Sequence, residues 1–249
     1  MGIKVDRDSF IPYYIQVKEM ILDRIKSGEW KVGEQLPGEP QLCKMFNVSR
    51  TVIRQALNQL AHDDLIVRQK GRGTFVAKPK LRGSLVQRLT GFHENMASQG
   101  KTAITRVIKQ DKIATSSRIA LFLNVERGTE LVRIERLRFV QDEPIVLVSS
   151  YLPYSLCPGL LTVDLEGNKS LYAYLEKELG MRIERGSRTI EAVAANEHEA
   201  HWLNIERAAP LILLDSVSYL KNETPIEYYH AVHRGDRSKF EVELVRSLE

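Results

Sequence analysis

Long apolar runs and cysteines are both scarce in this sequence of 249 residues. No hydrophobic run approaches the roughly 18 residues that a membrane-spanning helix needs. The first ten residues, MGIKVDRDSF, lack the hydrophobic core of a signal peptide. The two cysteines, Cys43 and Cys157, cannot form a disulfide framework. These absences exclude the membrane-spanning and disulfide-rich secreted classes and predict a cytoplasmic location.

Recognisable catalytic and metal-binding patterns are also missing. Ser149 and Ser150 lack the glycine frame of a nucleophile elbow. His198 and His201 stand three residues apart beside Glu197, but a solvated helix face explains them better than a metal site does. No cysteine and histidine set has zinc-ligand spacing. The sequence therefore predicts a protein that is not an enzyme and that needs neither a metal nor a cofactor.

Charge is present, but it is unevenly distributed. Residues 1–80 hold 14 basic and 9 acidic side chains, whereas residues 81–249 hold 22 and 23. The whole basic excess therefore belongs to the first third of the chain. Such an asymmetry suggests a polyanionic partner for that part alone.

The first third has the pattern of three helices followed by a basic hairpin. The helices are expected from Pro12 to Gly28, from about Gly38 to Asn47, and over 50–61 behind the N-cap Ser49. The segments LIVRQ and TFVAK then predict two short strands around the tip KGRG. Helix, short helix, tight turn, helix and hairpin together predict a winged helix-turn-helix domain, mostly α with a small β wing.

Arg50 and Arg54 lie four residues apart, so the third helix carries two like charges on one face at some cost. In a winged helix the start of the third helix faces the DNA major groove, where phosphates and guanine edges bind arginine. The helix start and the wing tip add N–H groups and further cations. The alternative is a solvated basic face on an ordinary three-helix unit. The predicted DNA-contacting residues are Glu39, Ser49, Arg50, Thr51, Arg54, Gln55, Lys70, Gly71 and Arg72.

The stretch LPGEPQLCKMFNVSRTVIRQALNQLAHDDLIVRQKGRGTFV resembles the DNA-binding domain of GntR-type bacterial transcription regulators. The resemblance covers residues 10–77 nearly without gaps. It implies that Arg50, Thr51 and Arg54 contact an operator and that Gly71 and its neighbours lie at the minor groove.

The rest of the chain contains an internal repeat. LNVERGTELVRIERLRFVQDEPI (123–145) recurs as LNIERAAPLILLDSVSYLKNETPI (203–226), and each copy follows a helix that begins after Ser116 or Asn196. Each unit reads as helix, strand, turn and strand, so we expect one antiparallel sheet with helices packed on it, an α+β fold. The predicted organisation is a DNA-binding domain over 1–77, a linker over 78–88 and a second domain over 89–249.

Arg136 and Arg138 share one face of a predicted strand with apolar residues. Two arginines on a half-buried face need an anion or acidic partners. The matching positions of the second repeat are Ser216 and Ser218, so the fold unit itself does not require arginine. This difference favours a binding role over ion pairs with neighbours such as Glu135, which is the alternative.

The segments LTGFHENM, RIERLRF, DEPIVLVSSYLP, SLYAYLE, RTIEAVAA and IEYYHAVHRGDRSKF resemble the UTRA ligand-sensing domain of the HutC subfamily of those regulators. The resemblance implies a chorismate-lyase-like fold that binds a small metabolite without catalysis. It places effector contacts at Thr90, Gly91, Arg136, Arg138, the loop from Asn168 to Ser170, Glu227 and His233.

The function expected from the sequence is that of a homodimeric regulator, a repressor of a metabolic operon, that binds a pseudo-palindromic double-stranded DNA operator. A small anionic effector would modulate this binding, with a sugar phosphate favoured by the paired arginines and a carboxylate as the second choice. The alternative is a chorismate-lyase-like enzyme with a DNA-binding appendage, which the missing catalytic pattern disfavours.

Overall fold

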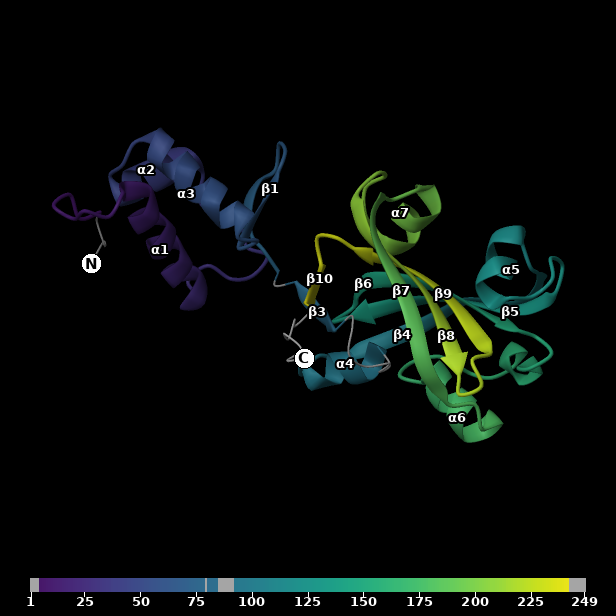
Figure 1. Ribbon diagram of the computed structural model, residues 1–249. Coiled ribbons are helices and arrows are strands. Elements are labelled where there is room, and N and C mark those ends of the chain that lie inside the picture. The colour runs from purple at the N-terminus through teal and green to yellow at the C-terminus, as the bar shows by residue number, and fades with distance from the viewer. Residues whose placement is uncertain (1–4, 79, 85–91, 242–249) are drawn as a thin grey trace, which may run out of the picture. The chain divides into compact units, whose positions relative to one another are not determined.

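The computed structural model describes residues 5–78, 80–84 and 92–241. The chain divides into two compact units, Met1–Pro79 and Lys80–Glu249. Within the described residues, no helix is long and apolar enough to cross a membrane. The two units are coloured along the chain in Figure 1 and are described separately.

The first unit contains three helices and a two-stranded antiparallel wing. Its elements are α1 (Tyr13–Lys26), α2 (Glu39–Phe46), α3 (Arg50–His62), β1 (Ile66–Gln69) and β2 (Gly73–Val76). Pro12 occupies the N-cap of α1 rather than its first turn. Asn47 ends α2 in the left-handed conformation, and the Ser49 hydroxyl caps α3 by accepting a hydrogen bond from the Val52 N–H at 3.4 Å. The predicted winged helix-turn-helix is confirmed.

The core of the first unit fixes which face of α3 is exposed. Ile53, Leu57 and Leu60 of α3 are almost completely buried against α1 and α2. Because these positions form one helical stripe, the opposite stripe must face solvent. That exposed stripe carries Arg50 and Arg54.

The second unit is built on a six-stranded antiparallel sheet with helices on both faces. Its elements are β3 (Leu81–Ser84), α4 (Phe92–Ser98), β4 (Ala103–Ala114), α5 (Ser117–Leu123), β5 (Glu130–Val140), β6 (Glu143–Pro153), a 3-10 turn (Pro158–Leu161), α6 (Leu171–Leu179), β7 (Ile183–Ala194), α7 (Glu197–Leu203), β8 (Pro210–Leu220), β9 (Pro225–Arg234) and β10 (Ser238–Glu241). The strand order β4-β5-β6-β9-β8-β7 confirms the antiparallel α+β fold.

The internal repeat appears directly in this topology. The first copy is β4, α5, β5 and β6, and the second is β7, α7, β8 and β9. The two copies meet where β6 pairs with β9 in the middle of the sheet. Ser116 and Asn196 cap α5 and α7 through the same kind of side-chain hydrogen bond, as the sequence predicts.

The interval 78–88 is not irregular throughout, because β3 lies within it and pairs in parallel with β10. Leu81 is buried with Met96 and Ala103. A strand of four residues is too short to show a period of two, so no sequence pattern predicts it.

The helices divide between the two faces of the sheet. Helices α4 and α6 cover one face, while α5 and α7 cover the other (Figure 1). Apolar residues pack beneath each helix, with Leu171 and Leu175 of α6 over Val132 and Ile134 of β5. On the face shared by α4 and α6, polar side chains interrupt this apolar packing.

Candidate functional sites

The start of α3 presents two arginines that share one carboxylate. The Arg50 Nε lies 2.8 Å from a Glu39 oxygen, and the Arg54 Nε lies 3.8 Å from the other oxygen. Both arginine side chains are mostly exposed, whereas that of Glu39 is about three-quarters covered. The hydrogen bond with Glu39 raises the pKa of Arg50 above its usual value. The repulsion between the arginines is therefore relieved within the protein before any DNA phosphate arrives.

The other residues predicted to contact DNA lie on the exposed surface of the first unit. Gly71 has a φ of +73°, which a glycine adopts without strain at the tip of the hairpin. The tip and the start of α3 thus each expose cations. The exposed members are Ser49, Thr51, Gln55, Lys70, Gly71 and Arg72.

The second unit holds a group of buried polar residues on the face covered by α4 and α6, which we call the inner polar cluster. Arg136 is only 3% exposed, and its guanidinium donates a hydrogen bond from Nη2 to the Ser150 hydroxyl at 2.9 Å. Its Nε has no partner among the described residues. Burial lowers the pKa of Arg136 to about 10, and the positive charge of Arg138 acts in the same direction. The guanidinium is still charged at neutral pH.

Arg138 lies two residues further along β5 on the same face. Its guanidinium carbon lies 4.9 Å from the Phe92 ring centroid, and Nη1 donates a long hydrogen bond of 3.5 Å to the Tyr229 hydroxyl. Its Nε is also buried without a partner among the described residues. Both arginines therefore have an unused donor at the same place on the sheet.

His233 completes this end of the cluster. It pairs in register with Val146, which in turn pairs with Arg138. Burial and the nearby positive charges of Arg138 and Arg188 lower the pKa of His233 to about 3. The ring is therefore neutral near pH 7, and its Nε2 has no partner among the described residues.

Glu227 supplies the negative group of the cluster. Its side chain is fully buried, and Oε2 accepts hydrogen bonds from the hydroxyls of Tyr172 at 2.7 Å and of Ser218 at 3.4 Å. Its Oε1 has no partner among the described residues. Burial and the charge of Glu227 raise the pKa of Tyr172, so this phenol remains a donor.

The loop before α6 borders the two arginines. Gly167 exchanges two backbone hydrogen bonds with Thr105 of β4, and Thr105 pairs with Arg138. Within this loop Asn168 is exposed, and Ser170 caps α6 through the Ala173 N–H at 3.3 Å. The loop therefore lies against β4, the strand next to the one that carries Arg136 and Arg138. The other two predicted effector positions, Thr90 and Gly91, lie outside the described residues.

Arg188 and Tyr172 also belong to the inner polar cluster, although no sequence pattern singles them out. Arg188 of β7 donates from Nε to the Ser216 hydroxyl at 2.7 Å, and its guanidinium lies 5.9 Å from the Tyr229 ring centroid. Ser216 occupies the position that matches Arg136 in the first repeat, so Arg188 brings a guanidinium to the second half of the sheet. Alternation along RTIEAVAA places Arg188 on one face of its strand. Only the strand order shows that Arg136 and Arg138 lie on the same face of the sheet.

The alternative in which Glu135 neutralises the arginines is not what the structure shows. Glu135 lies on the opposite face, where His198 of α7 contacts it at 3.0 Å. Its counterpart in the second repeat, Asp215, accepts a hydrogen bond from Arg118 of α5 at 2.8 Å. Each helix thus reaches an acid on the other repeat. Within the part of the chain that is described, no three His, Cys, Asp or Glu residues form a group that could hold a metal ion.

The first unit is a winged helix with an exposed arginine face. The second is an α+β unit in which several buried polar groups lack a partner among the described residues. This combination is typical of ligand-responsive transcription regulators. Comparisons with known proteins agree. The model of bacterial regulatory proteins of the gntR family matches residues 13–76, and the UTRA domain model matches residues 98–239.

The HTH-type transcriptional repressor NagR of Bacillus subtilis (strain 168) is 35% identical to this chain over 238 residues, which are 96% of this chain and 97% of NagR. The probable fructoselysine utilization operon transcriptional repressor of Escherichia coli (strain K12) is 31% identical over 93% of this chain and 94% of its own length. The crystal structure of PhnF from Mycobacterium smegmatis has a TM-score of 0.67 and 30% identity, and covers 93% of this chain and 100% of that one.

This chain therefore belongs to the GntR family of bacterial transcription regulators, in its HutC subfamily with a UTRA domain. The two relatives are named as transcriptional repressors rather than enzymes, which supports the prediction that the chain is not an enzyme.

Proposed function

We propose that this regulator is a repressor that senses a small anionic metabolite in its inner polar cluster. One observation carries the proposal: four polar atoms that have no partner among the described residues are buried on the same face of the sheet. Leaving such groups unsatisfied costs about 1–3 kcal/mol each, so a fold retains them where a ligand completes their bonds. The atoms are Arg136 Nε, Arg138 Nε, Glu227 Oε1 and His233 Nε2.

The arrangement of these atoms supports a ligand that combines an anionic group with a hydroxyl or an amine. Arg136 and Arg138 offer donors to an anionic group, and paired guanidinium groups suit the oxygens of a phosphate. Glu227 offers an acceptor to a hydroxyl or amine of the same molecule. A sugar phosphate satisfies both requirements, and a hydroxylated or amino-bearing carboxylate is the second choice. The relative from Escherichia coli is named for an operon of fructoselysine utilization, which fits a metabolite of this kind.

The first unit would bind operator DNA with α3 in the major groove and the wing at the minor groove. In a homodimer formed by the second units, two such domains would read the two halves of a pseudo-palindrome in the cytoplasm. The effector would act through its different affinities for the DNA-binding and DNA-free states of the dimer. An effector that prefers the DNA-free state would release the operator.

The test is a thermal-shift screen of the full-length protein with sugar phosphates, free sugars and small carboxylates. A ligand at about 100 times its dissociation constant adds roughly 2.7 kcal/mol to the free energy of unfolding. We expect a sugar phosphate to give this shift, and we expect Arg136→Ala to abolish it. Arg133→Ala is the matched control, because Arg133 lies on the same strand but on the opposite face, paired with Asp111 at 2.7 Å.

A shift from a carboxylate that Arg136→Ala removes would keep the site and replace the ligand class. A shift that survives both Arg136→Ala and Arg136→Lys would refute the inner polar cluster as the effector site. If Arg136→Ala were to unfold, Arg136→Lys would still provide the test, because it keeps the charge and removes the two-pronged donor.

A further inference from the structure

The segment between α1 and α2 pairs with β2 of the wing through an isolated antiparallel bridge between Gln35 and Phe75. The Leu36 N–H donates to the Thr74 carbonyl at 2.8 Å, and the Val76 N–H donates to the Glu34 carbonyl at 2.9 Å. A two-stranded hairpin is marginally stable by itself, so these additional backbone hydrogen bonds hold it in place. The wing is therefore anchored along β2 by residues that precede α2 in sequence.

Gln35 extends this anchoring to the tip of the wing. Its side-chain Nε2 donates to the Arg72 carbonyl at 3.0 Å. Gly73, the next residue, has a φ of +119°, and a Cβ at that position would overlap the Gln35 amide. The glycine thus permits both the turn and the close approach of Gln35. The bonded carbonyl belongs to one of the residues predicted to contact DNA.

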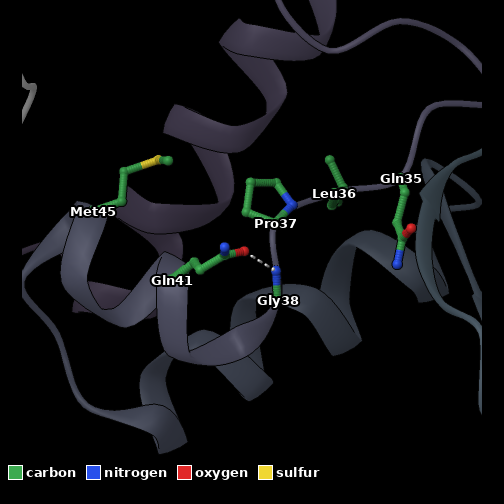
Figure 2. Close-up of a pocket in the computed structure, with 6 residues that line it drawn as sticks. All are labelled: Gln35, Leu36, Pro37, Gly38, Gln41 and Met45. Atoms are coloured by element: carbon green, nitrogen blue, oxygen red, sulfur yellow. Dashed lines mark hydrogen bonds between the residues drawn. The ribbon is translucent and has the colours of Figure 1, made fainter.

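The same segment is fixed at its other end. Leu36 is buried in the core of the first unit, and Pro37 restricts the backbone that follows. The Gly38 N–H donates to the Gln41 side-chain oxygen at 3.0 Å, which closes the start of α2. Figure 2 shows Gln35 at the wing end of this segment and the bond between Gly38 and Gln41 at the α2 end, around a shallow surface pocket of about 520 Å³.

We propose that Gln35 is a positioning residue for DNA reading, because it holds the wing tip in register with the recognition helix. Four residues after Gln35, Glu39 holds Arg50 and Arg54. One short segment therefore sets the positions of both elements that face DNA, and Gln35 acts through Lys70 and Arg72 rather than by touching bases. This inference rests on the proposed role of the wing in operator binding.

The experiment uses the full-length protein and a DNA duplex that the wild-type protein selects from a random library, with a scrambled duplex of equal length for comparison. Gln35→Met removes the amide and keeps the side-chain length. We expect it to weaken binding to the selected duplex about 3- to 10-fold, while the melting temperature and the binding of scrambled DNA stay the same. Gln16→Met is the matched control, because Gln16 also donates from an exposed surface to backbone carbonyls, those of Asp6 and Ile11.

A double-mutant cycle separates positioning from direct contact. In a Lys70→Ala/Arg72→Ala background, Gln35→Met should have no further effect on affinity, since the groups that it positions are absent. An equal loss in both backgrounds, or no loss in either, would overturn the inference. If Lys70→Ala/Arg72→Ala itself left the affinity for the selected duplex unchanged, the proposed role of the wing would fail instead, and with it the premise of this inference.

Discussion

The arginines of α3 and those of β5 lie in opposite surroundings. Arg50 and Arg54 stay in solvent and share the Glu39 carboxylate. Arg136 is buried and Arg138 is half-buried, and the Nε of each is buried without a partner among the described residues. Screened surface pairs contribute little to stability, whereas unsatisfied buried groups cost much. DNA binding should therefore depend on salt, and effector binding should change the stability of the fold.

The largest effect on the DNA side is expected from Arg54→Ala. The side chain is mostly exposed and its nearest carboxylate oxygen is 3.8 Å away, so its removal should leave the melting temperature unchanged. Loss of a guanine contact should weaken binding to the selected duplex by about 1–3 kcal/mol. A titration of that duplex in parallel with a melting curve checks both statements. Unchanged affinity would remove α3 from the recognition role.

The inner polar cluster should make the fold sensitive to acid. The pKa of His233 is about 3 in the folded protein and near 6.5 in an unfolded chain, so between these values only the unfolded chain binds the proton. Stability is therefore lost as the pH falls below about 6.5. Between pH 7 and pH 5, His233→Phe should lose roughly 1–2 kcal/mol less unfolding free energy than the wild type.

Denaturant unfolding at several pH values measures this difference. His201→Gln is the control, because His201 lies on the exposed face of α7. Identical pH dependence of the wild type and His233→Phe would show that the imidazole is not buried as described.

The smallest effect is expected from Glu39→Gln, and it concerns specificity. Removal of a negative charge near DNA phosphates should strengthen binding to scrambled DNA slightly. Loss of the group that holds Arg50 should weaken binding to the selected duplex, about 2- to 5-fold. Glu29→Gln makes the same charge change near Arg24, at 3.6 Å, outside α3 and the wing. If both variants changed the two affinities alike, Glu39 would act only through its charge.

The sequence was most informative where a local pattern determines the structure. The Ser49 cap, the Asn47 break and the capped helices after Ser116 and Asn196 depend on neighbouring residues, and all were predictable. The repeat also predicted the antiparallel pairing within each copy.

What the sequence could not provide was the strand order that joins β6 to β9. That pairing links residues about 80 apart and decides which side chains share a face. Arg188 shares a face with the arginines of β5 only through this order. Tyr172 reaches Glu227 only through the packing of α6 on the sheet, and no spacing in the sequence predicts that contact. The carboxylate that relieves the repulsion on α3 was missed for the same reason, because Glu39 belongs to a different helix.

The most direct test of the account measures both sites in the same experiment. Binding of the selected duplex is titrated with and without the ligand found in the thermal-shift screen, in the wild type, Arg136→Ala and Arg54→Ala. We expect the ligand to change the operator dissociation constant at least 5-fold in the wild type and not in Arg136→Ala. Arg54→Ala should weaken operator binding while keeping the full thermal shift. An equal ligand effect on operator binding in the wild type and Arg136→Ala would contradict the account.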